Sequence, residues 1–189
     1  MKPDGIQRAL IGEIMKRYER IGLKLVALKM FVPTEKMIEE HYLLDSDWKK
    51  NVGEKAIASY VKKGEVPPSS DPTEVGDLVV GRLKKYMTSG PVIAMVWEGA
   101  HSVELVRKIT GGTEPRSADV GTIRGDFVVD SYQIADSADR AIRNLIHASG
   151  SVGEAEKEIP HWFGEQEIIK YSVPHEATLY DVDIKGILG

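Results

Sequence analysis

Residues 91–97 read PVIAMVW, and the prediction of the fold starts from this run. The run is short and apolar and follows the turn Ser89-Gly90-Pro91, so it predicts a central strand. A second run, LKLVALKMF at 23–31, follows Gly22 and predicts a buried strand. Few strands alternating with helical segments predict an α/β (α+β) sandwich, in which a small sheet is covered by helices.

The segments around these strands carry helical signals. Apolar residues that recur in steps of three and four mark one face of a helix. The helices expected on this basis, or from caps and breakers, cover 7–21, 34–42, 51–62, 78–87, 102–110 and 152–163. The last one begins with Ser151 and Glu154, a capping-box pattern. Residues 127–129 predict a short strand, 130–141 show no clear period, and the last 19 residues predict a strand and an extended tail.

Composition limits the class of protein. The chain has 189 residues, 42% of them hydrophobic, which fits a single domain over residues 1–189 with a sizeable core. It has no cysteine, so disulfides and zinc-thiolate sites are excluded. A net charge of −4 and a sequence pI of about 5.8 argue against a general nucleic-acid-binding protein. Neither a membrane-spanning run nor a secretory signal is visible, so we expect a cytoplasmic protein.

One of the five histidines has a distinctive setting. Neither GxxxxGK[ST] nor GxGxxG occurs, so any nucleotide site must rely on side chains. His147 enters a helix through small residues, HASGS at 147–151, and backbone N–H groups at a helix start favour anions. A neutral imidazole also suits a nucleophile that must leave as readily as it attacks. A lone histidine is nevertheless more often a structural residue in a turn.

Basic and polar residues at the ends of predicted elements change that balance. Phosphate transfer needs positioned positive charge, and functional groups gather on loops. The candidates are Lys2, Arg107, Thr113, Arg124 and Asn144. Taken singly, each is more often a solvated surface group or a cap than a ligand. Their joint presence indicates a site for a phosphorylated ligand.

Four ordered blocks make the pattern specific. They are KPDGIQR at 2–8, SGPVIAMVWEG at 89–99, GTIRGDF at 121–127 and RNLIHASGS at 143–151. From Lys2 to about Tyr171 the chain closely resembles nucleoside diphosphate kinases. HASGS in place of the commoner HGSDS, with a proline-containing insertion, is similar to archaeal members. The resemblance implies the ferredoxin-like fold of this family, a small antiparallel sheet covered by helices.

The resemblance also implies a catalytic group. His147 would be the nucleophile that becomes phosphohistidine, and Glu158 would orient its imidazole. Ser149 would help to build the same nest, and Tyr42 would lie beside the transferred phosphate and the histidine.

Other residues would bind the nucleotide. Lys2 and Asn144 would contact the sugar hydroxyls, with Lys2 also near the transferred phosphate. Arg107, Thr113 and Arg124 would grip the outer phosphates. Mg²⁺ would arrive with the nucleotide, held mainly by phosphate oxygens and water, so no metal ligand is assigned to the protein.

The chain departs from the family pattern in several places. Val79 falls near the phenylalanine on which the base stacks in the family, so base binding would be weaker or use another aromatic. Ala148 replaces a glycine, and it would carry strain of about 1 kcal/mol if its φ were positive. The strand that precedes KPDG in the family is missing from the given chain. Residues 43–76 and 130–141 are long insertions, expected to be surface elaborations, with a nucleotide lid or a subunit contact as the alternative.

The implied activity is ping-pong transfer of the γ-phosphate from a nucleoside triphosphate such as ATP to a nucleoside diphosphate, through His147. The implied assembly is a homo-oligomer, usually a hexamer and sometimes a tetramer, without a membrane or a specific nucleic acid as partner. The alternative is a nucleotide-binding relative with reduced or no turnover because of the truncated N-terminus. A structural protein on the same fold is opposed by the intact set of candidate residues.

Overall fold

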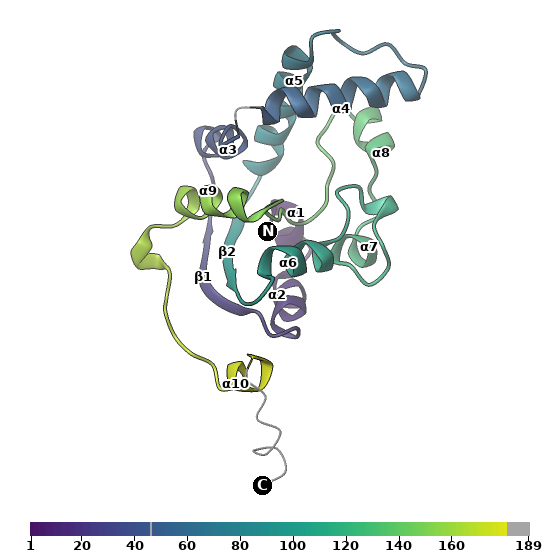
Figure 1. Ribbon diagram of the computed structural model, residues 1–189. Coiled ribbons are helices and arrows are strands. Elements are labelled where there is room, and N and C mark those ends of the chain that lie inside the picture. The colour runs from purple at the N-terminus through teal and green to yellow at the C-terminus, as the bar shows by residue number, and fades with distance from the viewer. Residues whose placement is uncertain (46, 181–189) are drawn as a thin grey trace.

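The computed structural model describes residues 1–45 and 47–180. In this part of the chain, β1 (Lys24–Phe31) and β2 (Val92–Glu98) form an antiparallel sheet with helices packed around it (Figure 1). The α-helices are α1 (Pro3–Gln7), α2 (Ile11–Glu19), α3 (Glu35–Tyr42), α4 (Trp48–Lys62), α5 (Pro72–Met87), α6 (Ser102–Thr110), α7 (Ile123–Phe127), α8 (Tyr132–Ser137), α9 (Val152–Trp162) and α10 (His175–Tyr180). Two 3₁₀ turns, η1 (Pro115–Ser117) and η2 (Glu165–Glu167), complete the order. The predicted α+β class is confirmed.

Both predicted strands form and pair with each other. The register runs from Lys24 opposite Glu98 to Phe31 opposite Val92, with an irregularity between Leu25 and Ala27. Short apolar runs bounded by glycine or proline are enough to identify such strands, because a run of this length and composition is typical of a buried strand.

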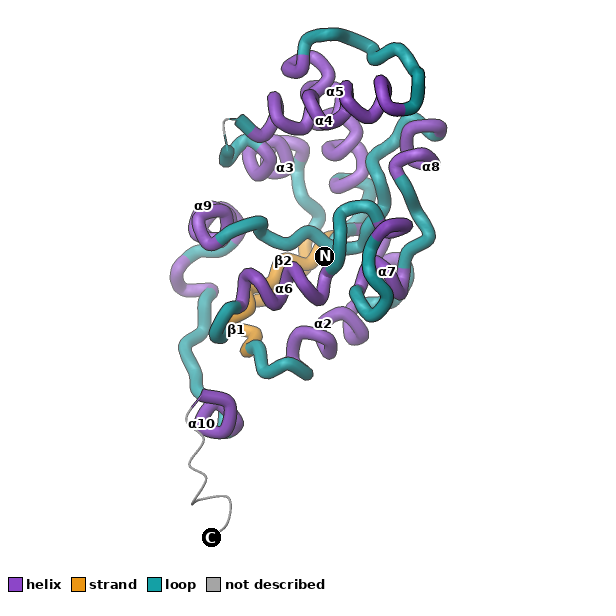
Figure 2. Tube along the Cα trace, turned by 45° about the vertical axis from the view of Figure 1, so that its right-hand side comes forward, coloured by secondary structure: helices purple, strands orange, loops and turns teal. Residues whose placement is uncertain are grey.

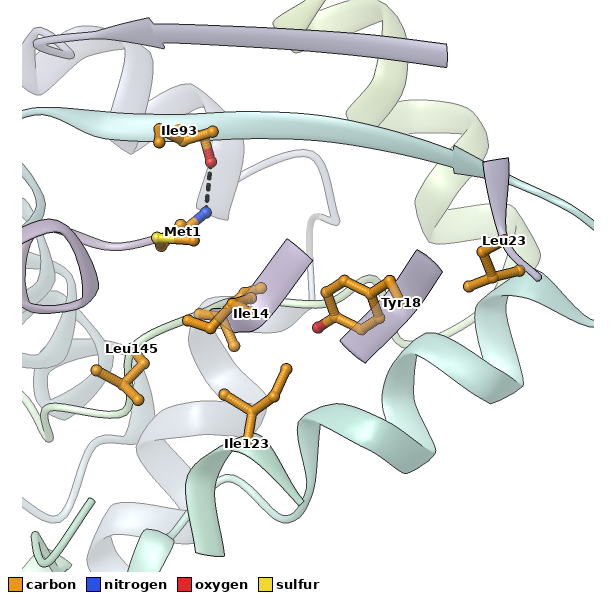
Figure 3. Close-up of a cluster of buried hydrophobic side chains, with 8 residues drawn as sticks. Met1, Ile14, Tyr18, Leu23, Ile93, Ile123 and Leu145 are labelled. Carbon is orange, nitrogen blue, oxygen red and sulfur yellow. Dashed lines mark hydrogen bonds between the residues drawn. The ribbon is translucent and has the colours of Figure 1, made fainter. Parts of the chain in front are cut away.

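The main core packs α2 and α7 against the sheet (Figure 3). Ile14 and Tyr18 lie one helical turn apart on α2, and both are fully buried, as is Ile123 at the start of α7. The helix predicted over 7–21 is wrong at its start, because α2 begins only at Ile11 and Gln7 belongs to the separate helix α1. Ala9 adopts a φ of 55° between them, which no helix interior allows.

Met1 takes the edge of β2 on the side away from β1. The N–H of Ile93 donates to the carbonyl of Met1 at 3.1 Å, and the amino group of Met1 donates to the carbonyl of Ile93 (Figure 3). Two residues that exchange both bonds form an antiparallel pair, so Met1 stands where a further strand would pair. Next to it lies a hollow of about 220 Å³, lined by residues 92–97 of β2, by parts of α6 and α9, and by Lys2 and His147.

The first predicted insertion, 43–76, contains α4 and the start of α5. These two helices approach closely because Gly53 and Gly76 lie at their contact. A Cβ added to Gly76 would lie 2.3 Å from the carbonyl oxygen of Lys49, and one added to Gly53 would lie 1.8 Å from that of Pro72. Close helix packing therefore depends on the absence of a side chain at both positions.

The second predicted insertion, 130–141, contains α8 and contacts the first. Lys63 forms an ion pair with Asp136, and Arg82 pairs with Asp139 at 2.6 Å. Both views place α3, α4 and α5 together at one end of the molecule, with α8 beside α4 (Figures 1 and 2).

Three further expectations need correction. The strand predicted at 127–129 is wrong, because Thr122 caps a short helix, α7, with its side chain accepting from the N–H of Gly125. α8 begins after Ser131, whose side chain caps it within a stretch of no clear period. Of the last 19 residues, α10 replaces the predicted strand, and 181–189 lie outside the described residues. Within the described ranges, no helix is both long and apolar enough to cross a membrane.

Candidate active site

The KPDG turn holds the backbone that leads to His147. Asp4 accepts from the hydroxyl of Tyr86 at 2.5 Å and from the N–H of Leu145 at 3.1 Å. The N–H of Lys2 donates to the carbonyl of Leu145 at 2.7 Å. A Cβ added to Gly5 would lie 3.1 Å from that same carbonyl oxygen, so glycine allows the close approach.

Leu145 has a φ of 65°, in the left-handed region. This conformation costs about 1–2 kcal/mol for a residue with a side chain. It persists because both backbone polar groups of Leu145 are bonded to the KPDG turn and its side chain is fully buried. Ala148 is not among the described residues with positive φ, so the strain considered for that alanine does not arise.

His147 and two other predicted residues form a hydrogen-bonded group. The Nε2 of His147 lies 2.8 Å from Oε1 of Glu158, and the hydroxyl of Ser149 donates to the other carboxylate oxygen. Burial alone would raise the pKa of Glu158, but the bonds from His147 and Ser149 lower it to about 2. An ionised carboxylate can only accept, so we assign the proton of the neutral imidazole to Nε2. Nδ1 then carries the lone pair, on a side chain that is 38% exposed.

Lys2 and Asn144 form a buried polar chain beside this group. Nζ of Lys2 donates to the side-chain oxygen of Asn144 at 2.7 Å, and the amide of Asn144 donates to the carbonyl of Thr113 at 2.9 Å. Burial, followed by the charge of Arg124, lowers the pKa of Lys2 to about 7. The charge of Lys2 at neutral pH is therefore sensitive to any anion that comes close.

The two predicted arginines each donate to a backbone carbonyl in residues 146–148. The buried guanidinium of Arg124 donates to three backbone carbonyls, those of Gly111, Asn144 and Ile146. Three of its five N–H groups are thus used, and the other two have no hydrogen-bond partner within residues 1–45 and 47–180. Arg107 is exposed on α6, and its Nη1 lies 3.4 Å from the carbonyl of Ala148. The side chain of Thr113 is exposed.

Two predicted site residues lie further from His147. The ring of Tyr42 packs on the ring of His41, with 4.9 Å between centroids, and His41 in turn is 4.9 Å from His147. Val79 is half-buried on α5 and is not among the residues that line the hollow. The ring of Trp48 lies against Tyr42, with 4.8 Å between centroids.

Sequence reasoning missed His41 and Trp162. The indole N–H of Trp162 donates to Nδ1 of His41 at 3.2 Å, and Nε2 of His41 lies 4.0 Å from Oε1 of Glu158. One signal was available, because Trp162 follows Glu158 by four residues and therefore shares its helix face. Nothing local in the sequence places His41, on α3, against α9.

His41, His147 and Glu158 also form the group of described side chains that comes closest to a metal-ligand set. Their ligand atoms all lie within 4.8 Å of one another. Two imidazoles suit a transition metal, whereas Mg²⁺ prefers oxygen ligands, and Glu158 already accepts from His147 and Ser149. These three side chains therefore do not suit Mg²⁺ as direct ligands. A Mg²⁺ ion at this site would have to be held by another molecule.

Comparison with known families identifies a close match along most of the chain. A family model described as nucleoside diphosphate kinase matches residues 1–64 and 75–168. A nucleoside diphosphate kinase of Pyrobaculum aerophilum is 45% identical over 174 residues, which cover 90% of this chain and 95% of that protein. A nucleoside diphosphate kinase of Borreliella burgdorferi is 37% identical over 180 residues, which cover 95% and 93%.

Solved structures agree with this match. The crystal structure of an NDP kinase from Pyrobaculum aerophilum has a TM-score of 0.86 at 43% identity, covering 90% of this chain and 96% of that one. A Borrelia burgdorferi nucleoside-diphosphate kinase, solved as a transition-state mimic with vanadate and ADP, has a TM-score of 0.76 at 37% identity, covering 94% and 91%. The ferredoxin-like fold predicted from the sequence is confirmed by this likeness.

Proposed function

The chain belongs to the nucleoside diphosphate kinase family, and we propose that it carries the γ-phosphate between nucleotides on Nδ1 of His147. The observation that supports this choice of atom is the bond between Nε2 and Glu158. It leaves Nδ1 as the free nitrogen of a partly exposed ring, next to residues to which Arg107 and Arg124 donate.

The first half-reaction is an in-line displacement. The lone pair of Nδ1 forms a bond to the γ-phosphorus, and the bond from that phosphorus to the bridging oxygen breaks, so the nucleoside diphosphate leaves with the electron pair. Positive charge develops on the imidazole while its Nε2–H stays bonded to Glu158. The ionised carboxylate stabilises that charge. A second nucleoside diphosphate then attacks the phosphohistidine in the reverse reaction.

Cationic groups stabilise the negative charge of the transferring phosphate. Arg107 and the two unused N–H groups of Arg124 supply fixed donors, and the hydroxyl of Thr113 supplies a neutral one. Lys2 adds a donor whose positive charge increases as the phosphate approaches, because an anion raises the pKa of a neighbouring lysine.

Mg²⁺ is the cofactor, bound through the nucleotide phosphates and water. When bound it neutralises charge on the outer phosphates. The bonds of Glu158 support this arrangement, because its carboxylate already accepts from His147 and Ser149.

Three further properties are part of the proposal. The base of the nucleotide stacks on an aromatic ring rather than on Val79. The ring of Trp48 is the candidate for this contact, because it lies against Tyr42. The chain forms a homo-oligomer. The single-domain organisation over residues 1–189 and the cytoplasmic location also stay predictions.

Labelling with ATP that carries ³²P at the γ position tests the proposal. The protein should acquire an acid-labile label that GDP removes as GTP, and His147→Ala should abolish both steps. His175→Ala is the matched control, because His175 is exposed on α10, and it should label normally. A labelled His147→Ala protein would reject the assigned nucleophile. Tight ADP binding by the wild type without any labelling would instead support the alternative, a nucleotide-binding relative with little turnover.

A further inference from the structure

His41 lies in the site, in contact with the ring of His147, and the mechanism above gives it no role. It is buried, with a side chain 5% exposed, and it comes from α3, whereas His147 and Glu158 come from the loop before α9 and from α9 itself. Its ring stands at 90° to the ring of His147, edge against face, with centroids 4.9 Å apart. A buried histidine in contact with a nucleophile has either a ligand role or a positioning role.

The bond from Trp162 decides between these roles. An indole N–H can only donate, so Nδ1 of His41 must hold a lone pair. A neutral imidazole then carries its proton on Nε2. That nitrogen is the one that faces Glu158, and it is also the one that a metal shared with Glu158 would need unprotonated. The tautomer fixed by Trp162 therefore opposes metal binding and presents an N–H to the carboxylate.

His41 also stays neutral over the working pH range. Burial, followed by the charges of His147, His161 and Lys2, lowers the pKa of His41 to about 3, although Glu158 acts in the opposite direction. Protonation would place a second positive charge beside the phosphorylated ring. A neutral His41 presents an N–H dipole that stabilises the carboxylate of Glu158. Because it carries no positive charge, it does not weaken the attraction between that carboxylate and His147.

We propose that His41, held by Trp162, is a positioning residue that fixes Glu158 and the plane of the His147 ring for attack through Nδ1. This inference rests on the proposed function and adds a residue to it. Glu158 accepts from His147 and Ser149, and Nε2 of His41 lies 4.0 Å from the same Oε1 that His147 contacts. At this distance the two atoms are not hydrogen-bonded, but catalytic contacts that are long in a free enzyme often shorten in the reacting complex.

Helix α9 ties the arrangement together. It carries Glu158 and Trp162 one turn apart, so the carboxylate and the group that orients His41 move as one body. A second link between α9 and α3 runs from Nε2 of His161 to the carbonyl of Met37 at 3.0 Å. The ring of Trp162 also packs on His41 and on Phe31 of β1, which fixes the direction of its N–H.

Two substitutions at position 41 separate orientation from packing. His41→Phe keeps a flat ring but removes both nitrogens, and it should lower kcat about tenfold while KM for the nucleotides stays within about twofold. His41→Gln offers an amide N–H near the position of Nε2 and should recover kcat to within about threefold of the wild type. Trp162→Phe should also lower kcat, and it provides the test if His41→Phe does not fold.

NMR of the ¹⁵N-labelled imidazoles gives a readout that packing alone would not change. The wild type should show His41 as the Nε2–H tautomer, and Trp162→Phe should release it into a mixture. Unchanged kcat with raised KM in His41→Phe, or an Nδ1–H tautomer in the wild type, would overturn the inference. Stoichiometric binding of Zn²⁺ that is lost in His41→Phe would establish the metal role instead. If the wild type takes no label from ATP, the proposed function fails, whereas the tautomer result stands independently.

Discussion

Binding of a nucleoside diphosphate should draw a proton from solution onto Lys2. In the free protein, burial lowers the pKa of Lys2 to about 7, against an ordinary value of 10.5. Phosphate oxygens that come within a few ångströms favour the charged form and raise this pKa. A group whose pKa rises on binding takes up a proton, so ADP binding should become weaker as pH increases above 7.

The size of the effect follows from the two pKa values. With a pKa of about 7, Lys2 is about 90% uncharged at pH 8 and about 10% uncharged at pH 6. If the bound phosphate restores a pKa above 9, uptake should be about 0.8 to 0.9 proton at pH 8 and about 0.1 proton at pH 6. Calorimetric titration of ADP in Tris and in HEPES at each pH measures this number, as the slope of binding enthalpy against buffer ionisation enthalpy.

Lys2→Met removes the titrating group and nearly preserves its length, so uptake at pH 8 should fall to near zero. Lys36→Met is the matched control, because Lys36 is a solvated lysine on α3 with an 83% exposed side chain. Uptake below about 0.3 proton in the wild type at pH 8, or equal uptake in Lys2→Met, would refute the place given to Lys2.

Four substitutions test helix packing and hydrogen bonding. Gly76→Ala should destabilise the protein by about 2 kcal/mol in urea unfolding, because its Cβ meets backbone of α4, whereas Gly81→Ala, with nothing within 4 Å, should stabilise it by up to about 1 kcal/mol. Asp130→Asn should cost about 2 kcal/mol in the same assay, since that carboxylate is 7% exposed and holds Arg140 and the N–H of Arg143. Ser149→Ala should lower kcat by about tenfold in steady-state exchange, through the loss of one donor to the catalytic carboxylate; equal rates would contradict its role.

Local signals in the sequence were sufficient for the elements with strong patterns. β1, β2, α3, α6 and α9 form within a residue or two of the predicted bounds, because each is an apolar run or face closed off by a cap or breaker. Ser151 caps α9 as predicted. Glu154, however, reaches back to the N–H of Gly150 rather than to that of Ser151, so only half of the capping box forms.

Long-range contacts account for what the sequence could not show. α5 begins at Pro72, six residues before the predicted start, since its first turns are stabilised by packing against α4 at Gly76 rather than by an apolar stripe of their own. α8 is short, and its Asp136 pairs with Lys63, a residue just after α4 that is far away in sequence. The place of His41 beside Glu158 depends on how α3 packs against α9, a contact between residues 117 positions apart that no motif encodes.

The KPDG turn and the His147 segment form one structural unit, although about 140 residues separate them. RNLIHAS at 143–149 gives no local signal of an unusual backbone, yet its geometry depends on Leu145 adopting a left-handed φ. That conformation is unfavourable by about 1–2 kcal/mol in an isolated chain. Here the bonds from Asp4 and Lys2 to the backbone of Leu145, together with its full burial, offset the cost. The same two residues of KPDG therefore set the direction in which the chain delivers Asn144 to Nζ of Lys2 and the imidazole of His147 to Glu158. A change at Asp4 should for this reason disturb catalysis as well as folding, even though Asp4 donates nothing to the phosphate.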